Sequence, residues 1–179
     1  MIKCCSPAKA PKIAVELNNV NVDNSDYFTT ATFNNVVRSQ VGNFFIMHEN
    51  IRFFRNFFDE FHSFGSELNR AADIIVFSET WFSANTCHGV QGYTGFHTYR
   101  ADKRGGGVSV FIRNCYTSTH TAKFSVCHAC YEISVVKVSL SNNCTVIIIG
   151  VYRPPDKSKI PEFTRKLNEI LSSTSQFTI

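Results

Sequence analysis

The chain has 179 residues, 44% of them hydrophobic, which is enough to bury one sizeable core in a single globular domain. The formal charge of +4 permits contact with nucleic acid but does not require it. The seven cysteines are an odd number without regular spacing. This argues against a secreted disulfide framework and for a reducing, intracellular location. The N-terminus has no long apolar run, so we expect neither a signal peptide nor a membrane span.

Residues 1–40 mix charged and polar residues with scattered apolar ones and show no sustained period. We predict that they form an irregular or disordered leader, and we place the globular domain at residues 41–179.

The first periodic segments predict a strand followed by a helix. Residues 43–47 are apolar and aromatic, which indicates a strand that ends before His48, Glu49 and Asn50. In residues 51–68 phenylalanines recur at helical spacing, with charged residues mainly on the other side. We predict an amphipathic helix whose phenylalanine stripe packs in the core; the stripe comprises Phe54, Phe57, Phe58, Phe61 and Phe64.

The segment ADIIVFSETWF, residues 72–82, predicts a second, buried strand that ends at Ser78. Glu79 follows directly, where open α/β sheets place ligands, although a solvated loop residue would look the same. A strand–helix–strand crossover normally makes the two strands parallel. We therefore expect Asn50 and Glu79 at the same edge of one sheet.

Residues 83–107 contain many glycines and are predicted to form a loop. The triplet Gly105–Gly107 lacks the lysine and hydroxyl residue of a P-loop, so we interpret it as a flexible entry to a strand at residues 108–112. Arg100, Lys103 and Arg104 form a basic cluster beside it. They are either solvated or contact phosphates without reading sequence.

The remaining segments predict a hairpin and a second helix. Residues 131–140 and 144–152 are rich in Val and Ile and are joined by a short polar turn, which is typical of an antiparallel hairpin. The second strand is apolar throughout and is expected at the centre of a sheet; it ends at Tyr152, Arg153 and two prolines. A helix is predicted from Ser158 to about Ser172, with Pro161 in its first turn. Residues 176–179 look like the start of another strand.

Four segments, in this order, resemble the endonuclease/exonuclease/phosphatase domain of jockey-type non-LTR retrotransposons. HENIRFFRNFFDEF resembles the first motif of that family, and DIIVFSETWF resembles the second. YRADKRGGGVSVFIRN resembles its Arg-x-Asp and glycine triplet, and IIIGVYRPPD its Tyr-Arg-Pro-Pro motif. Each motif alone is modest, but the ordered set is specific.

The resemblance implies a four-layered α/β sandwich similar to deoxyribonuclease I and to apurinic/apyrimidinic endonucleases. It implies an enzyme that uses Mg²⁺ (or Mn²⁺) to nick double-stranded DNA in the nucleus and so primes a fused reverse transcriptase. Glu79 matches the metal ligand of the family and Asn50 its asparagine in the metal and phosphate site. Tyr152 matches the tyrosine whose hydroxyl reaches the phosphate. Arg153 is expected to contact the backbone, and His48 to be structural.

The departures from the family pattern limit this expectation. A Gly-Asp-Phe-Asn segment and a Ser-Asp-His segment, which supply the water-orienting and phosphate-stabilising groups, do not occur in the sequence. Phe53 and Phe54 stand where the family has Ser-Leu, and Glu49 replaces an apolar residue. The sequence thus predicts a partial sandwich without its C-terminal strands, and an isolated chain that does not nick DNA.

Two alternatives remain open. The chain could be a non-catalytic nucleic-acid-binding remnant that uses Arg100, Lys103, Arg104 and Arg153. It could also belong to a phosphatase or sphingomyelinase branch of the same superfamily, although the Tyr-Arg-Pro-Pro and Glu-Thr-Trp segments favour the retrotransposon branch. The single CxxC at Cys127 and Cys130 is weak evidence for zinc.

Overall fold

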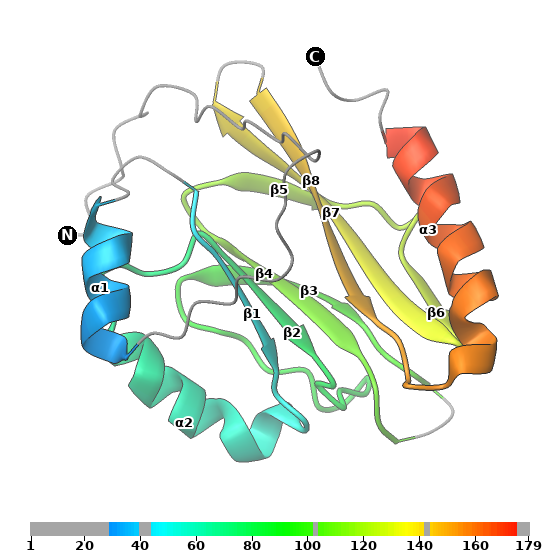
Figure 1. The fold of residues 1–179 in the computed structure, drawn as a ribbon, viewed down its shortest axis with the longest axis horizontal. Helices are drawn as coiled ribbons and strands as arrows, with labels where there is room; N and C mark the ends of the chain where they lie inside the picture. The colour runs from blue at the N-terminus through cyan, green and yellow to red at the C-terminus, as the bar shows by residue number, and fades with distance from the viewer. Residues whose placement is uncertain (1–28, 40–43, 102–103, 142–143, 175–179) are drawn as a thin grey trace.

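The computed structural model describes residues 29–39, 44–101, 104–141 and 144–174, which form a mixed α/β structure with two sheets (Figure 1). This confirms the predicted α/β class. None of the described helices is long and apolar enough to cross a membrane. The elements in chain order are α1 (Thr30–Ser39), β1 (Ile46–Asn50), α2 (Phe54–Glu67), β2 (Ile74–Ser78), β3 (Tyr93–Thr98), β4 (Val108–Arg113), β5 (Thr117–His120), β6 (Val126–His128), β7 (Tyr131–Ser141), β8 (Cys144–Tyr152), the 3₁₀ turn η2 (Lys157–Lys159) and α3 (Ile160–Thr174).

The first sheet has the strand order β1-β2-β4-β3. β1 is parallel to β2, whereas β4 is antiparallel to both β2 and β3. The parallel pair follows from the helical connection α2, because strands joined by a crossover run in the same direction. Asn50 lies opposite Ser78 in this pair. The sequence-based expectation that the ends of these strands meet at one edge is confirmed.

The second sheet is built on the long strand β7. β8 pairs antiparallel with one side of β7, and β5 and β6 pair with the other side. The predicted β7–β8 hairpin is confirmed, although residues 142 and 143 of its turn lie outside the described part of the chain. β8 was expected at the centre of a sheet. Within the described residues it pairs with β7 alone and so lies at the edge.

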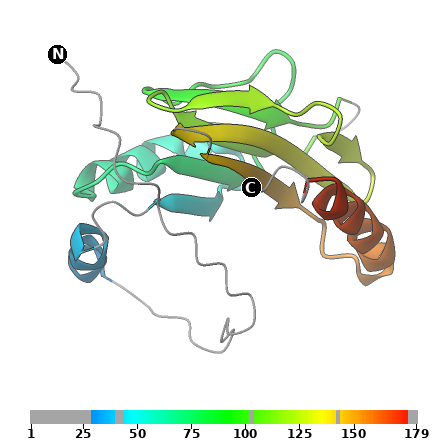
Figure 2. The ribbon, with the colours of Figure 1, turned by 90° about the horizontal axis from the view of Figure 1, so that it is seen from above.

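Three apolar clusters hold these layers together. One lies between α2 and the first sheet and contains Phe54 and Phe77. A second joins the two sheets through β-branched residues such as Val76, Val110 and Val136. The third lies between α3 and the second sheet and contains Ile170. Helices α2 and α3 therefore pack on the two sheets, one helix on each sheet (Figure 2).

Gly150 in β8 packs directly against valines of the first sheet. A Cβ atom at this position would lie 2.8 Å from Cγ1 of Val108 and 2.9 Å from Cγ2 of Val110. Only a glycine leaves room for this contact, because the valines opposite cannot move within a close-packed core.

Several predicted boundaries were wrong. Residues 30–39, assigned to the irregular leader, form helix α1, while residues 1–28 lie outside the described part. β1 begins later than predicted and includes His48, Glu49 and Asn50. β3 occupies part of the segment predicted as a loop. The predicted strand at 176–179 lies outside the described residues.

The phenylalanine stripe of α2 is core only in part. Phe54 is buried, and Phe58 and Phe61 pack against the same cluster. Phe57 and Phe64 are 44% and 39% exposed. The prediction that the whole stripe packs in the core is therefore wrong for these two residues, which lie outside the cluster beneath α2.

The burial of His97 predicts a pH-dependent stability. Its Nδ1 lies 2.9 Å from Oγ of Ser109, and burial, followed by the nearby His120, lowers the pKa of His97 below its ordinary 6.5. The unfolded chain therefore binds the proton more readily, and the fold loses stability as the pH falls through about 6.5. Denaturant titrations at pH 7.5 and 5.5 should show this loss. It should be smaller in His97→Asn, and an equal loss in that variant would contradict the assignment.

Candidate functional site

Asn50 and Glu79 meet at the carboxyl end of the parallel strand pair. Asn50 is the last residue of β1, and Glu79 follows the last residue of β2. Nδ2 of Asn50 donates a hydrogen bond of 3.1 Å to Oε1 of Glu79. The predicted juxtaposition is thus present, and the amide fixes the orientation of the Glu79 carboxylate.

The loops after β1 and β2 are joined by backbone hydrogen bonds that continue beyond the sheet. The backbone amide of Ile51 donates to the carbonyl of Ser78 at 3.0 Å, and that of Phe53 to the carbonyl of Glu79 at 2.8 Å. Four non-glycine residues of these loops have positive φ: Arg52 (38°), Phe53 (84°), Glu79 (56°) and Trp81 (56°). Such a conformation costs about 1–2 kcal/mol per residue, and strain of this kind clusters at functional sites.

Tyr152 joins this site from the second sheet. It ends β8 and lies opposite Glu132 of β7. Burial raises the pKa of Tyr152, and the negative charges of Glu79 and Glu132 and a side-chain hydrogen bond with Glu79 raise it further. The hydroxyl is therefore protonated at neutral pH and can serve as a hydrogen-bond donor.

A buried ion pair between Arg100 and Glu132 lies next to Tyr152. Glu132 is completely buried; one carboxylate oxygen pairs with Nε of Arg100, and the other accepts a hydrogen bond of 3.3 Å from the amide of Gly107. Nη2 of Arg100 is buried without a hydrogen-bond partner among the described residues. The sequence analysis did not select Glu132. Glu132 could have been noticed as a carboxylate within an apolar run rich in Val and Ile, because a buried charge needs a partner.

The glycine triplet is a packed part of this site. Gly106 and Gly107 are buried, and all three glycines have positive φ. A Cβ at Gly106 would lie 2.9 Å from Oε2 of Glu132, and one at Gly107 would lie 2.6 Å from Oγ1 of Thr80. The triplet therefore lets the backbone approach the ion pair and the Glu79 loop closely, a role different from the flexible entry expected from the sequence.

The predicted basic cluster divides into residues with different surroundings. Arg100 is committed to Glu132, so it is not an exposed phosphate contact of the expected kind. Arg104 is exposed, and Lys103 lies outside the described residues. Nη1 of Arg153 donates to the carbonyls of Pro154 and Asp156 of the same loop at 2.7 and 3.0 Å, and its contact with nucleic acid stays a prediction. His48 is exposed, with Nε2 3.4 Å from Oγ of Ser78.

The donor set at Glu79 is compatible with a hard cation. Within the described ranges, no three His, Cys, Asp or Glu side chains gather in a group that could hold a metal ion. Glu79 supplies one carboxylate and Asn50 one amide oxygen. Mg²⁺ retains several waters and needs only one or two carboxylates, and both side chains are at least partly open to solvent. The residues therefore fit a largely hydrated Mg²⁺ better than a metal that needs a closed protein cage.

Comparison with known proteins does not identify a family for this chain. No protein-family model matches the chain, and a search of curated proteins gives no significant match.

Proposed function

We propose that the site formed by Asn50, Glu79 and Tyr152 binds a divalent cation and a DNA phosphodiester, as part of a Mg²⁺-dependent endonuclease of the deoxyribonuclease I-like type. The observation that carries the proposal is the convergence of these three residues. They lie at the ends of three strands in two sheets, and each matches a site residue of the retrotransposon endonucleases that the sequence resembles.

Each side chain has a distinct task in this proposal. Mg²⁺ or Mn²⁺, when bound, would neutralise charge on the phosphoryl oxygens. Glu79 holds the cation, and the amide of Asn50 orients the Glu79 carboxylate. Tyr152 donates its hydroxyl proton in a hydrogen bond to a phosphate oxygen, because its raised pKa keeps it neutral. The buried Arg100–Glu132 pair helps to keep the Tyr152 hydroxyl protonated, because the negative charge of Glu132 raises its pKa more than the positive charge of Arg100 lowers it.

The layer order supports the same proposal. Two sheets packed face to face, with α2 on one outer face and α3 on the other, are compatible with the four-layered sandwich of these nucleases. Association with a reverse transcriptase and action in the nucleus are part of the proposal through the sequence resemblance alone.

The chain of 179 residues is expected to bind double-stranded DNA in a Mg²⁺-dependent manner without nicking it. Cleavage needs a group that activates water. In this proposal Glu79 is occupied by the cation and Tyr152 keeps its proton. A gel-shift titration with Mg²⁺ or EDTA tests binding, and conversion of supercoiled plasmid to open circles tests cleavage. Metal-dependent nicking that Glu79→Ala abolishes would contradict the expected inactivity while supporting the proposed chemistry.

Binding that is independent of the metal and equal in Glu79→Ala would contradict the proposed site. If that binding also fell steeply with salt, it would favour a nucleic-acid-binding remnant that acts through its arginines.

A further inference from the structure

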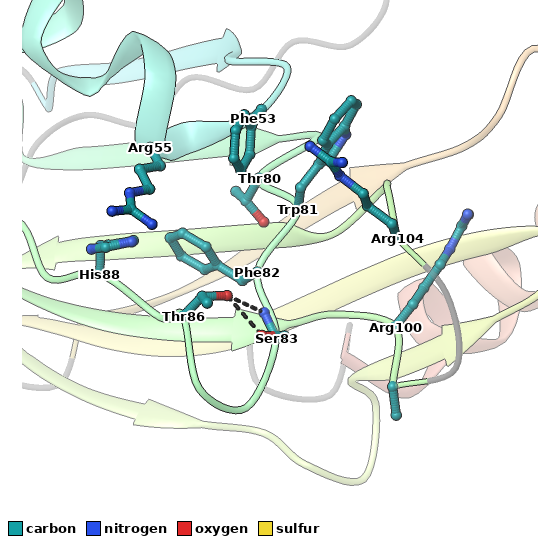
Figure 3. Close-up of a pocket in the computed structure, with 11 residues that line it drawn as sticks. Phe53, Arg55, Thr80, Trp81, Phe82, Ser83, Thr86, His88, Arg100 and Arg104 are labelled. Atoms are coloured by element: carbon teal, nitrogen blue, oxygen red, sulfur yellow. Dashed lines mark hydrogen bonds between the residues drawn. The ribbon is translucent and has the colours of Figure 1, made fainter.

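A hollow of about 430 Å³ is lined by residues at the start of α2, by the loop that follows Glu79, and by Arg100, Ala101 and Arg104 (Figure 3). The rings of Phe53 and Trp81 stack on one side of it, with centroids 5.4 Å apart. The guanidinium of Arg104 lies 5.3 Å from the centroid of Phe53 and 5.1 Å from that of Trp81. Arg55 and His88 lie on the opposite side in Figure 3. This volume is within the usual range of ligand pockets.

Core packing does not account for this aromatic pair. Phe53 and Trp81 are only partly buried, and both have positive φ, which is strained for bulky residues. A glycine would relieve that strain at either position. Phe53 also replaces the serine expected at this position of the motif. The strained backbone thus presents two rings towards a hollow next to the candidate site, as expected for a binding surface.

The charge of the hollow selects the class of ligand. Its described lining contains Arg55 and Arg104, and no acidic residue; Arg100 also lines it, but its charge is paired with Glu132. Aromatic faces combined with arginines are the groups that hold single-stranded nucleic acid, since the rings stack on bases and the guanidinium groups attract phosphates. A paired base already stacks within its duplex and cannot enter such a hollow without being turned out.

We infer that the hollow binds one unpaired base of DNA, adjacent to the phosphate held at Glu79. The position of that phosphate rests on the proposed function, whereas the stacking itself does not need the metal. The chain should therefore prefer a duplex with an unpaired nucleotide to a fully paired duplex.

The only tryptophan of the sequence, Trp81, makes the test direct, because its fluorescence reports on the hollow. The full chain is titrated in EDTA with three duplexes: one with a single unpaired thymine, one with an abasic residue at that place, and one fully paired. We expect the unpaired thymine to quench Trp81 and to bind roughly 5- to 100-fold more tightly than the abasic duplex. Equal binding and quenching by all three duplexes would overturn the inference, and tighter binding of the corresponding RNA would overturn the assignment to DNA.

Matched variants separate the hollow from general charge and from folding. Phe53→Leu and Arg104→Gln should each remove most of the preference for the unpaired thymine. Phe64→Leu and Arg165→Gln alter an exposed phenylalanine on α2 and an exposed arginine on α3, and they should keep it. If Phe53→Leu fails to fold by circular dichroism, Arg104→Gln decides, because it leaves the strained backbone unchanged. An unaltered preference in Arg104→Gln would overturn the inference.

The same titrations with and without Mg²⁺ distinguish the two proposals. A preference for the unpaired base without any effect of Mg²⁺ supports the hollow and contradicts the metal site. An effect of Mg²⁺ without that preference supports the metal site and overturns the inference about the hollow.

Discussion

Replacing Glu132 by alanine is expected to lower the free energy of unfolding by about 3–5 kcal/mol, the usual cost of breaking a buried ion pair. Glu132 is fully buried, and the side chain of its partner Arg100 is only 10% exposed. The variant would leave the guanidinium in the interior without its counter-charge. It would also remove the acceptor of the Gly107 amide. Denaturant unfolding followed by circular dichroism measures the loss.

Two further variants show whether the loss arises from the unpaired charge. Glu132→Gln keeps the size and an acceptor for Gly107, so its loss should be smaller. The double variant Glu132→Leu with Arg100→Met removes both charges and should recover most of the stability. Glu162→Ala, which breaks an exposed ion pair with Arg165 on α3, should change stability little. A loss in Glu132→Ala as small as that in Glu162→Ala would contradict the buried pair.

The meeting of Asn50 and Glu79 could be predicted because it depends on topology alone. An apolar run, an amphipathic helix and a second apolar run specify a parallel pair whose ends share one edge. The position of Tyr152 was different. The sequence placed it at the end of a strand in a hairpin, but only the family resemblance brought it to the same site. Its pairing with Glu132 and its proximity to Glu79 come from the packing of two sheets.

The strands that were missed are held mainly by their neighbours. β3 contains Gly95 and three polar residues in its six positions, so its local pattern indicates a loop. It becomes a strand because its full length pairs with β4. β5 and β6 are short and pair with β7 in the same way. Tertiary pairing thus overrides weak local propensity in all three strands.

The contacts of the glycine triplet could not be predicted for a related reason. The bond from Gly107 to Glu132 joins residues 25 positions apart, and the close approach of Gly106 to Arg100 and Glu132 needs the folded positions of two strands and a loop. No local pattern carries such information. The positive φ of Glu79 is equally hidden, because a glutamate in sequence gives no sign of a left-handed conformation.

That conformation makes Glu79 the position where a glycine should affect stability and binding differently. A glycine there would relieve about 1–2 kcal/mol of strain, offset by about 0.5–1 kcal/mol of added flexibility in the unfolded chain. Glu79→Gly and Glu79→Ala both lose the hydrogen bonds of the carboxylate with Asn50 and Tyr152, so Glu79→Ala is the proper reference. Glu79→Gly should be as stable as Glu79→Ala, or more stable by up to about 1.5 kcal/mol. It should nevertheless lose the Mg²⁺-dependent part of DNA binding.

Glu79→Gln tests the effect of the carboxylate charge alone, because it keeps the side-chain length and an acceptor for Asn50 and does not add the backbone freedom of a glycine. We expect it to weaken Mg²⁺-dependent binding by tenfold or more, because changing even a residue behind a metal ligand typically costs 10- to 100-fold. Glu49→Gln is the matched control: Glu49 precedes Asn50 but points to the opposite face of β1, so binding should keep its response to Mg²⁺. Gel shifts with and without Mg²⁺, alongside denaturant unfolding, measure both effects. A Glu79→Gly variant that is clearly less stable than Glu79→Ala would contradict the strain, and an unchanged response to Mg²⁺ in Glu79→Gln would contradict the metal ligand.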